Sequence, residues 1–224
     1  MKHKLYGLFL AAACALPAAD DLIVNVAHVE FRVANLEKTR AYYTGVLQIP
    51  LAYDRKNASG KTTSIFLQIN REQFLGFSEG SPVGLNHVAF LTQKIDAVHK
   101  LIEDLGLNPP PLRTGTDRTR NFALPVAGNL RVEFTEYEPD SLQARSGMSN
   151  KTVLGIERVG VPVADPEATR AFFKSKRGFS EAAPYLEFLP AGAPVRMRVK
   201  VRKPSSLRPG PDPDGVIIDP VAAN

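Results

Sequence analysis

Residues 33–43 read V-A-N-L-E-K-T-R-A-Y-Y, and residues 163–173 read V-A-D-P-E-A-T-R-A-F-F. Six of the eleven positions are identical, and the two stretches are offset by 130 residues. Each follows an alternating run that is typical of a strand, at 27–33 and 157–163, and each leads into an amphipathic helix, at 36–47 and 166–176. Residues 86–92 and 95–105 repeat this strand and helix once more. The chain is therefore built from copies of one unit.

Strand-like runs after the first two helices complete the unit. Three follow the first helix, at 51–55, 62–69 and 73–77, and three follow the second, near 112, at 119–124 and at 130–137. Each complete unit is thus β-α-β-β-β. We predict an α+β domain over residues 22–140, with its helices on one face of the sheet.

The third copy keeps its strand and helix and then loses the pattern. After a linker at 141–153, we predict a degenerate partial module over 154–202. Residues 195–202 read V-R-M-R-V-K-V-R, which predicts one half-exposed strand with a solvated basic face, or alternatively a face that meets an anion. Residues 203–224 contain several prolines, so we expect a loose, Pro-rich tail.

Composition excludes several classes of protein. The chain has 224 residues, of which 44% are hydrophobic and 23% charged, as in an ordinary globular protein. The net charge of +5 is concentrated at the two ends, and no zinc-finger spacing or basic helix accompanies it. We therefore expect no nucleic-acid partner. The apolar run at 5–19 is too short for a comfortable membrane span.

Residues 1–19 have the parts of a secretory signal peptide. Lys2 and Lys4 precede an apolar run, and small residues precede Asp20. This pattern predicts an exported, periplasmic or secreted bacterial protein; a buried N-terminal helix is the alternative. Cys14 is the only cysteine, and its surroundings loosely resemble a lipoprotein acylation site, which we favour less than ordinary cleavage. Cleavage after Cys14 would leave a mature protein without disulfides or thiolate metal sites.

Three residues could share a metal ion. His28 and His87 occupy the same position in two copies of the unit, and both point away from the face that packs on the helix. Glu133 alternates with apolar Val132 and Phe134 on the last strand of the second unit, so it faces the same space. Two imidazoles and a carboxylate suit Fe(II), and also Mn(II), Co(II) or Zn(II). The alternative is a pair of hydrogen-bonded histidines without a metal, which the repeat symmetry disfavours.

At this point the sequence resembles the vicinal oxygen chelate superfamily, which contains glyoxalases, bleomycin-resistance proteins and extradiol dioxygenases. The resemblance rests on A-H-V-E-F-R-V with the following T-R-A-Y-Y-T-G-V-L, on L-N-H-V-A-F and on A-G-N-L-R-V-E-F. It covers residues 24–138, with 154–179 as a degenerate further module. The resemblance implies paired modules that form a cupped mixed sheet around a divalent metal. It also implies His28, His87 and Glu133 as the ligands.

The same resemblance marks two departures. A fourth ligand of glyoxalase I-like members, a glutamate on the last strand of the first unit, falls at Gly76 here, which disfavours a glyoxalase I site. In the third module Arg158 stands at the position of His28, so we expect that module to bind no metal.

These observations predict an exported, divalent-metal-dependent enzyme, with Fe(II) favoured. We expect a dioxygenase-like reaction on a small molecule with vicinal oxygens. The alternatives are a redox-neutral lyase or isomerase at the same metal, and a metal-free protein that sequesters a small molecule. Either a monomer or a homodimer could complete the cup.

Further residues are assigned around the metal. Glu30 lies on the same strand face as His28 and is the candidate base or proton shuttle; the alternative is a salt bridge with Arg32 or Arg120. Arg118, Arg120 and Phe122 are the candidate substrate-binding residues.

Overall fold

The computed structural model describes residues 19–125, 130–147, 150–176, 185–203, 207 and 210–223. The predicted signal segment up to residue 18, with Cys14, lies outside these residues. Within the described ranges, no helix combines the length and the apolar character needed to cross a membrane.

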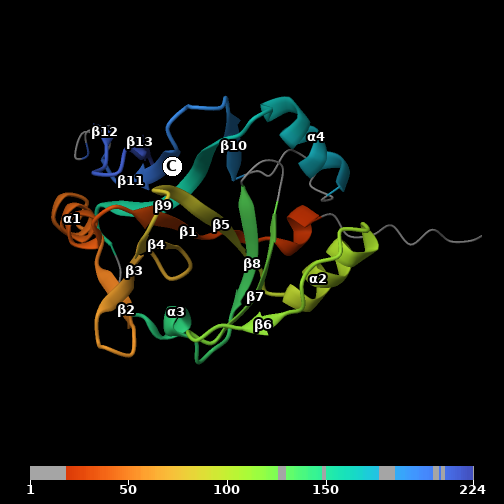
Figure 1. The fold of residues 1–224 in the computed structure, drawn as a ribbon, viewed down its shortest axis with the longest axis horizontal. Coiled ribbons are helices and arrows are strands. Elements are labelled where there is room, and N and C mark those ends of the chain that lie inside the picture. Colours follow the sequence, from red (N-terminus) through yellow and green to blue (C-terminus); the bar gives the residue numbers. More distant parts are fainter. Residues whose placement is uncertain are drawn as a thin grey trace, which may run out of the picture.

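The first two units form one eight-stranded sheet, sheet A. The first unit consists of β1 (Asn25–Val33), α1 (Leu36–Ala41) with a π-helical turn (Tyr42–Val46), β2 (Leu51–Lys56), β3 (Thr62–Gln68) and β4 (Phe74–Glu79). The second consists of β5 (Gly84–Leu91), α2 (Ile95–Asp104), β6 (Arg113–Thr114), β7 (Thr119–Pro125) and β8 (Arg131–Tyr137). The predicted β-α-β-β-β modules are therefore confirmed. Figure 1 shows α1 and α2 outside the curved sheet, on opposite sides of the molecule.

The strand order places the first strands of the two units side by side at the centre of sheet A. Sheet A runs β2-β3-β4-β1-β5-β8-β7-β6, so β1 and β5 are its central, antiparallel pair. β4 pairs parallel with β1, and β8 pairs parallel with β5. Val29, Phe31, Val88 and Phe90 are buried on the helix side of the central strands. The residues that alternate with them, including His28 and His87, face the concave side.

The remaining residues form a second sheet, sheet B, after the short helix α3 (Leu142–Arg145). Its elements are β9 (Val153–Pro162), α4 (Pro166–Lys176), β10 (Leu186–Leu189), β11 (Arg196–Val201), β12 (Gly210–Pro211) and β13 (Ile217–Ala222). The strand order is β10-β9-β11-β13-β12.

The end of the chain differs from the loose tail that its prolines predicted. β13 pairs parallel with β11 over its whole length, and β12 pairs with β13 at the outer edge. Pro211 lies in this two-residue edge strand, where a missing N–H group costs no interior hydrogen bond. Pro220 lies in β13 beyond the part that β12 covers, so its outer side needs no ladder donor either.

Both polar contacts and a shared apolar core join the two sheets. The Tyr43 hydroxyl after α1 donates to Asp212 Oδ2 (2.8 Å), and the Thr39 hydroxyl donates to Asp214 Oδ2 (2.8 Å). Gln73 donates to the carbonyl of Ile156 (3.0 Å) and accepts from its amide (2.9 Å). The buried apolar cluster includes residues of both sheets. The third module and the end of the chain are therefore packed onto the double module.

Candidate metal centre

Two imidazole nitrogens meet at the centre of the concave face of sheet A. His28 lies on β1 and His87 on β5, and their Nε2 atoms are 2.9 Å apart. Both residues are less than a tenth exposed, and their rings are nearly perpendicular, at 79°. Nitrogens bound at right angles to one ion at about 2.1 Å would also lie about 3 Å apart. This geometry fits two neighbouring ligands of one ion, and the same distance also fits a hydrogen bond between two neutral imidazoles.

Glu133 completes the group from β8. Its Oε1 lies 3.6 Å from His28 Nε2, and its Oε2 lies 3.9 Å from His87 Nε2. The register explains the meeting, because Ala89 on β5 pairs with His28 on one side and with Glu133 on the other. The structure therefore brings together the two histidines that the repeat singled out and the glutamate that strand alternation added.

Burial determines the charges of these three side chains in the absence of an ion. Loss of solvation lowers the pKa of His28 to about 3, with His87 as the next cause. Loss of solvation, followed by the nearby Arg131, also lowers the pKa of His87 to about 3. Loss of solvation raises the pKa of Glu133 to about 7. Two neutral imidazoles and one buried carboxylate, whose negative charge a bound cation would stabilise, form a donor set that fits a divalent metal.

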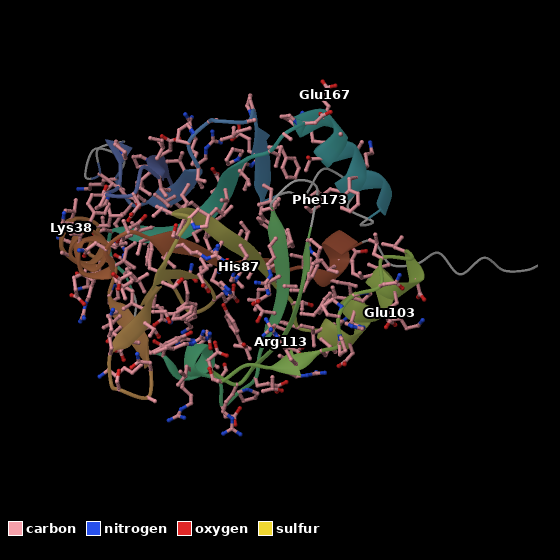
Figure 2. All side chains as sticks on the ribbon, viewed as in Figure 1. Lys38, His87, Glu103, Arg113, Glu167 and Phe173 are labelled. Atoms are coloured by element: carbon pink, nitrogen blue, oxygen red, sulfur yellow. The ribbon has the colours of Figure 1, made fainter. Side chains whose placement is uncertain are left out.

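The cluster opens into a cavity of about 410 Å³. Figure 2 shows His87 near the middle of the molecule, and both His87 and Arg113 line this cavity. Three arginines line the cavity together with the cluster, namely Arg55, Arg113 and Arg131. The Arg55 guanidinium lies over the Phe66 ring (4.6 Å) and donates to the buried Asp117 (2.6 Å). The cavity is thus polar, and its lining combines these three arginines with the carboxyl groups of Glu30, Asp117 and Glu133.

Neither a family model nor a curated protein matches the sequence. Solved structures do match. An extradiol ring-cleaving dioxygenase from B. fuscum superposes with a TM-score of 0.68 at 15% identity, covering 94% of this chain and 74% of that one. The Mn(II)-bound glyoxalase from Novosphingobium aromaticivorans gives 0.66 at 11% identity, covering 90% and 82%. A 2,3-dioxygenase from Pseudomonas sp. KL28 gives 0.63 at 12% identity, covering 91% and 93%.

The chain has the vicinal oxygen chelate fold. The matches extend over sheet B as well as sheet A, because they cover nine-tenths of the chain. At these identities the likeness establishes the fold, and the chemistry has to be argued from the side chains.

Glu30 is a fourth polar group at the centre of this fold. Its ligand atom and those of His28 and His87 all lie within 4.8 Å of one another, with Glu30 Oε2 3.9 Å from His87 Nε2. Glu30 Oε1 accepts from Asn86 Nδ2 (3.0 Å), and Arg32 donates to the same Asn86 (3.1 Å). The predicted alternative was a salt bridge of Glu30 with Arg32 or Arg120. In the structure the side-chain amide of Asn86 links Glu30 to Arg32 instead.

Gly76 makes room for that carboxylate. Gly76 lies directly beside Glu30 on the neighbouring strand β4. A Cβ atom at position 76 would lie 3.2 Å from Glu30 Cγ and 2.9 Å from a carbon of the Phe66 ring. A glutamate could not stand at position 76 beside Glu30 without displacing these neighbours. The second carboxylate beside the histidines is therefore that of Glu30 on β1, and β4 contributes only the space at Gly76.

The predicted substrate-binding residues lie outside the cavity. Arg118 forms an exposed ion pair with Asp140 (2.9 Å), and Arg120 pairs with Asp96 of α2 (2.7 Å). Phe122 is buried against Phe134, on the helix side of β7. Because side chains alternate along a strand, the residues of β7 that line the cavity are Thr119 and Asn121.

Arg131 was identifiable from the sequence, since it alternates in step with Glu133 on β8. Arg113 lies on a two-residue strand and Arg55 on β2, where no motif pointed to the site.

Proposed function

We propose that this protein is a divalent-metal enzyme of the dioxygenase type, with Fe(II) as its metal and a small molecule with two vicinal oxygens as its substrate. The observation that carries the proposal is the convergence of His28, His87 and Glu133 in a cavity that is open to solvent on one side. Bound Fe(II) would supply Lewis acidity toward the two oxygens and a place for O₂. Two of the similar structures described above are dioxygenases, and one of them is an extradiol ring-cleaving enzyme, which supports this choice.

Glu30 is placed to hold a proton. Asn86 orients the carboxylate through Oε1, and Oε2 is directed toward the histidine pair. A substrate hydroxyl brought against the cluster would meet Oε2 and could transfer its proton there. Glu30 is thus the proposed base.

The arginines define the substrate more narrowly. Arg55, Arg113 and Arg131 line the cavity, and only Arg55 forms an ion pair with a described acidic residue. Arg113 donates to Asn121 through Nε (2.8 Å), and this hydrogen bond does not use its two terminal nitrogens. Guanidinium groups bind carboxylates through paired hydrogen bonds. We therefore propose a substrate that carries a carboxylate besides its vicinal oxygens.

Oxygen consumption tests the proposal directly. The protein is loaded with Fe(II) under anaerobic conditions, and O₂ uptake is measured with catechol and with catechols that carry a carboxylate side chain. We expect uptake with the carboxylated compounds and a ring-opened product. Bound iron without uptake across the panel would contradict the dioxygenase reaction.

A redox-neutral lyase or isomerase is the second candidate. Glu30 offers a fourth ligand atom beside the histidines, and one similar structure is a Mn(II)-bound glyoxalase. This candidate predicts activity with Mn(II) in the absence of O₂.

Export is a further part of the proposed function, and it rests on residues 1–19. Fractionation of a bacterial host that expresses the full chain, followed by N-terminal sequencing, tests it. We expect a mature protein outside the cytoplasm that begins near Asp20; an intact N-terminus in the cytoplasm would contradict export.

A further inference from the structure

Sheet B repeats the five central strands of sheet A. Its order β10-β9-β11-β13-β12 corresponds to β4-β1-β5-β8-β7, with the same parallel and antiparallel pairings. The register of β1 slips at Ala27 and that of β9 slips at Glu157, which are separated by the 130-residue offset of the sequence repeat. Sheet B therefore has its own counterpart of the metal-binding face.

Charged residues occupy that counterpart. Gly160 faces Arg196 between β9 and β11 as Glu30 faces His87 between β1 and β5. Likewise Arg198 faces Asp219 as Ala89 faces Glu133. The three ligand positions of sheet A are thus occupied in sheet B by Arg158 for His28, Arg196 for His87 and Asp219 for Glu133. A guanidinium cannot ligate a metal, but it donates hydrogen bonds to oxyanions.

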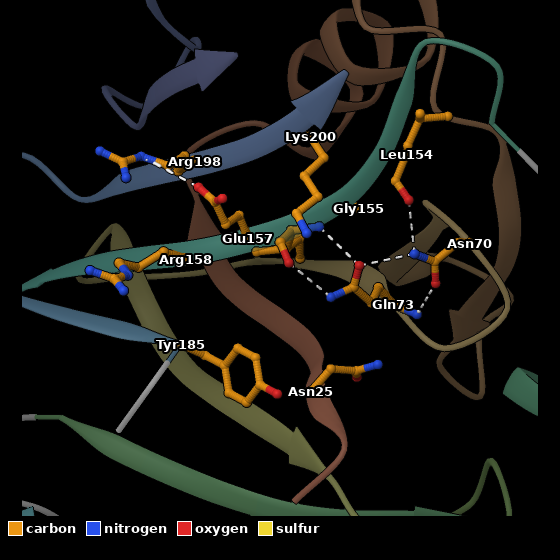
Figure 3. Close-up of a pocket in the computed structure, with 11 residues that line it drawn as sticks. Asn25, Asn70, Gln73, Leu154, Gly155, Glu157, Arg158, Tyr185, Arg198 and Lys200 are labelled. Atoms are coloured by element: carbon orange, nitrogen blue, oxygen red, sulfur yellow. Dashed lines mark hydrogen bonds and ion pairs between the residues drawn. The ribbon is translucent and has the colours of Figure 1, made fainter. Parts of the chain in front are cut away.

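A second cavity of about 500 Å³ lies on this face, between sheet B, the start of β1 and the turn that joins β3 to β4. Figure 3 shows Arg158, Arg198 and Lys200 around it. Among the described residues that line the cavity, Glu157 is the one acidic side chain. Its Oε2 lies 3.7 Å from Arg198 Nε, and both side chains are partly exposed. Three cations against one carboxylate leave a net positive charge in the cavity.

The opposite wall is rigid and already hydrogen-bonded. Gln73 binds both backbone groups of Ile156, and Asn70 donates to Gln73 Oε1 (2.9 Å) and to the carbonyl of Leu154 (3.0 Å). A Cβ atom at Gly155 would lie 2.8 Å from Gln73 Oε1, so the close approach depends on glycine there. Because these amides are hydrogen-bonded within the wall, Lys200 and Arg198 are the charged groups on the sheet B side of the cavity that would meet an anionic ligand.

We propose that the second cavity binds a small oxyanion, a phosphate or a carboxylate, at Lys200 and Arg198. The site needs no metal and is separate from the proposed enzymatic reaction. Where sheet A uses a metal to bind oxygen atoms of its ligand, sheet B uses guanidinium and ammonium groups at related positions.

Calorimetric titration of the full chain with inorganic phosphate and, separately, with succinate tests the proposal. We expect saturable binding of at least one probe at one site per chain; the tighter probe identifies the kind of oxyanion. Arg198→Gln and Lys200→Gln should each weaken binding about tenfold, as expected for the loss of a charge-assisted hydrogen bond. Thermal unfolding of each variant, followed by circular dichroism, verifies that it folds.

Two matched variants control for charge alone and for the first cavity. Arg196→Gln removes one charge from the same face of β11, but Arg196 pairs with Asp219 and does not line the cavity. Arg131→Gln alters the first cavity instead. Both should change the affinity less than twofold. Absence of saturable binding with both probes, or equal weakening by Arg196→Gln and Arg198→Gln, would overturn the proposal.

Discussion

At the scale of single residues, the candidate centre depends on neutral imidazoles in a buried place. His28 and His87 are each less than a tenth exposed, and their neighbours include several arginines, which disfavour protonation. Such histidines remain available as ligands at pH values where exposed imidazoles are charged. The same burial lowers the free energy of unfolding of the metal-free protein at acidic pH, because the histidines gain protons more readily in the unfolded chain.

The stability of the metal-free protein should therefore fall as the pH decreases. The folded pKa of each histidine, about 3, lies below the model-peptide value of 6.5, so the unfolded chain binds more protons between these values. Glu133 opposes this between pH 4.5 and about 7, because its folded pKa is raised. The free energy of unfolding, measured by urea titration with a chelator present, should decrease from pH 6.5 downward and most steeply below pH 4.5.

A double variant, His28→Gln with His87→Gln, should flatten that decrease. His99→Gln is the matched control, since His99 lies on α2 and contacts Phe122 away from the cluster. The same pH dependence in the double variant and in the parent would contradict the assignment of the effect to the buried pair.

Arg131 provides a second test at this scale. If it binds the substrate carboxylate, Arg131→Gln should raise KM for a carboxylated catechol about tenfold and leave KM for catechol nearly unchanged. Arg118→Gln, outside the cavity, should change neither value. An equal rise of KM for both compounds in Arg131→Gln would show that the arginine does not select the carboxylate.

At the scale of elements, alternation along strands decides which predictions hold. His28, His87 and Glu133 lie close together on the concave side because their neighbours Val29, Val88 and Val132 are buried on the helix side. On β7, the buried Phe122 and Leu124 mark the helix side in the same way, so Arg120, which alternates in step with them, lies on that side and outside the cavity. The cationic residues of the cavity come from separate strands, and only their pairing in sheet A brings them together.

The contact between β1 and β4 gives a prediction for Gly76. Gly76→Ala should destabilise the fold by about 1–3 kcal/mol, because its Cβ would overlap the Phe66 ring and press on Glu30. Gly80→Ala, whose Cβ would lie 3.6 Å from Arg32 Cδ, is the control and should cost much less. Urea unfolding of both variants measures the difference; equal stabilities would show that the space at Gly76 is not restricted.

At the scale of the whole molecule, the end of the chain is part of the fold. Its strands were not predictable from local sequence, because β13 is held by the distant β11 and by apolar contacts of Ile218. The repeat did predict the modules of sheet A, since both halves carry the same periodicity. Long-range pairing therefore accounts for the main difference between the sequence-based expectation and the structure.

The hydrogen bond from Tyr43 to Asp212 links that end to α1 and tests its contribution. Tyr43→Phe should lower the free energy of unfolding by about 1–2 kcal/mol, because a buried donor to a carboxylate is removed. Tyr42→Phe is the control, since the Tyr42 hydroxyl has no hydrogen-bond partner among the described residues. An equal effect of the two substitutions in urea unfolding would contradict a specific role for this bond.

We propose that His28, His87 and Glu133 hold one divalent ion. Metal content per chain, measured by mass spectrometry after Fe(II) loading and gel filtration, tests it most directly. We predict one iron per chain in the parent protein and in His99→Ala, and a loss of most of the iron in His87→Ala and in Glu133→Ala. Iron that is absent from the parent, or that is retained equally by all four proteins, would show that these three side chains do not hold the ion.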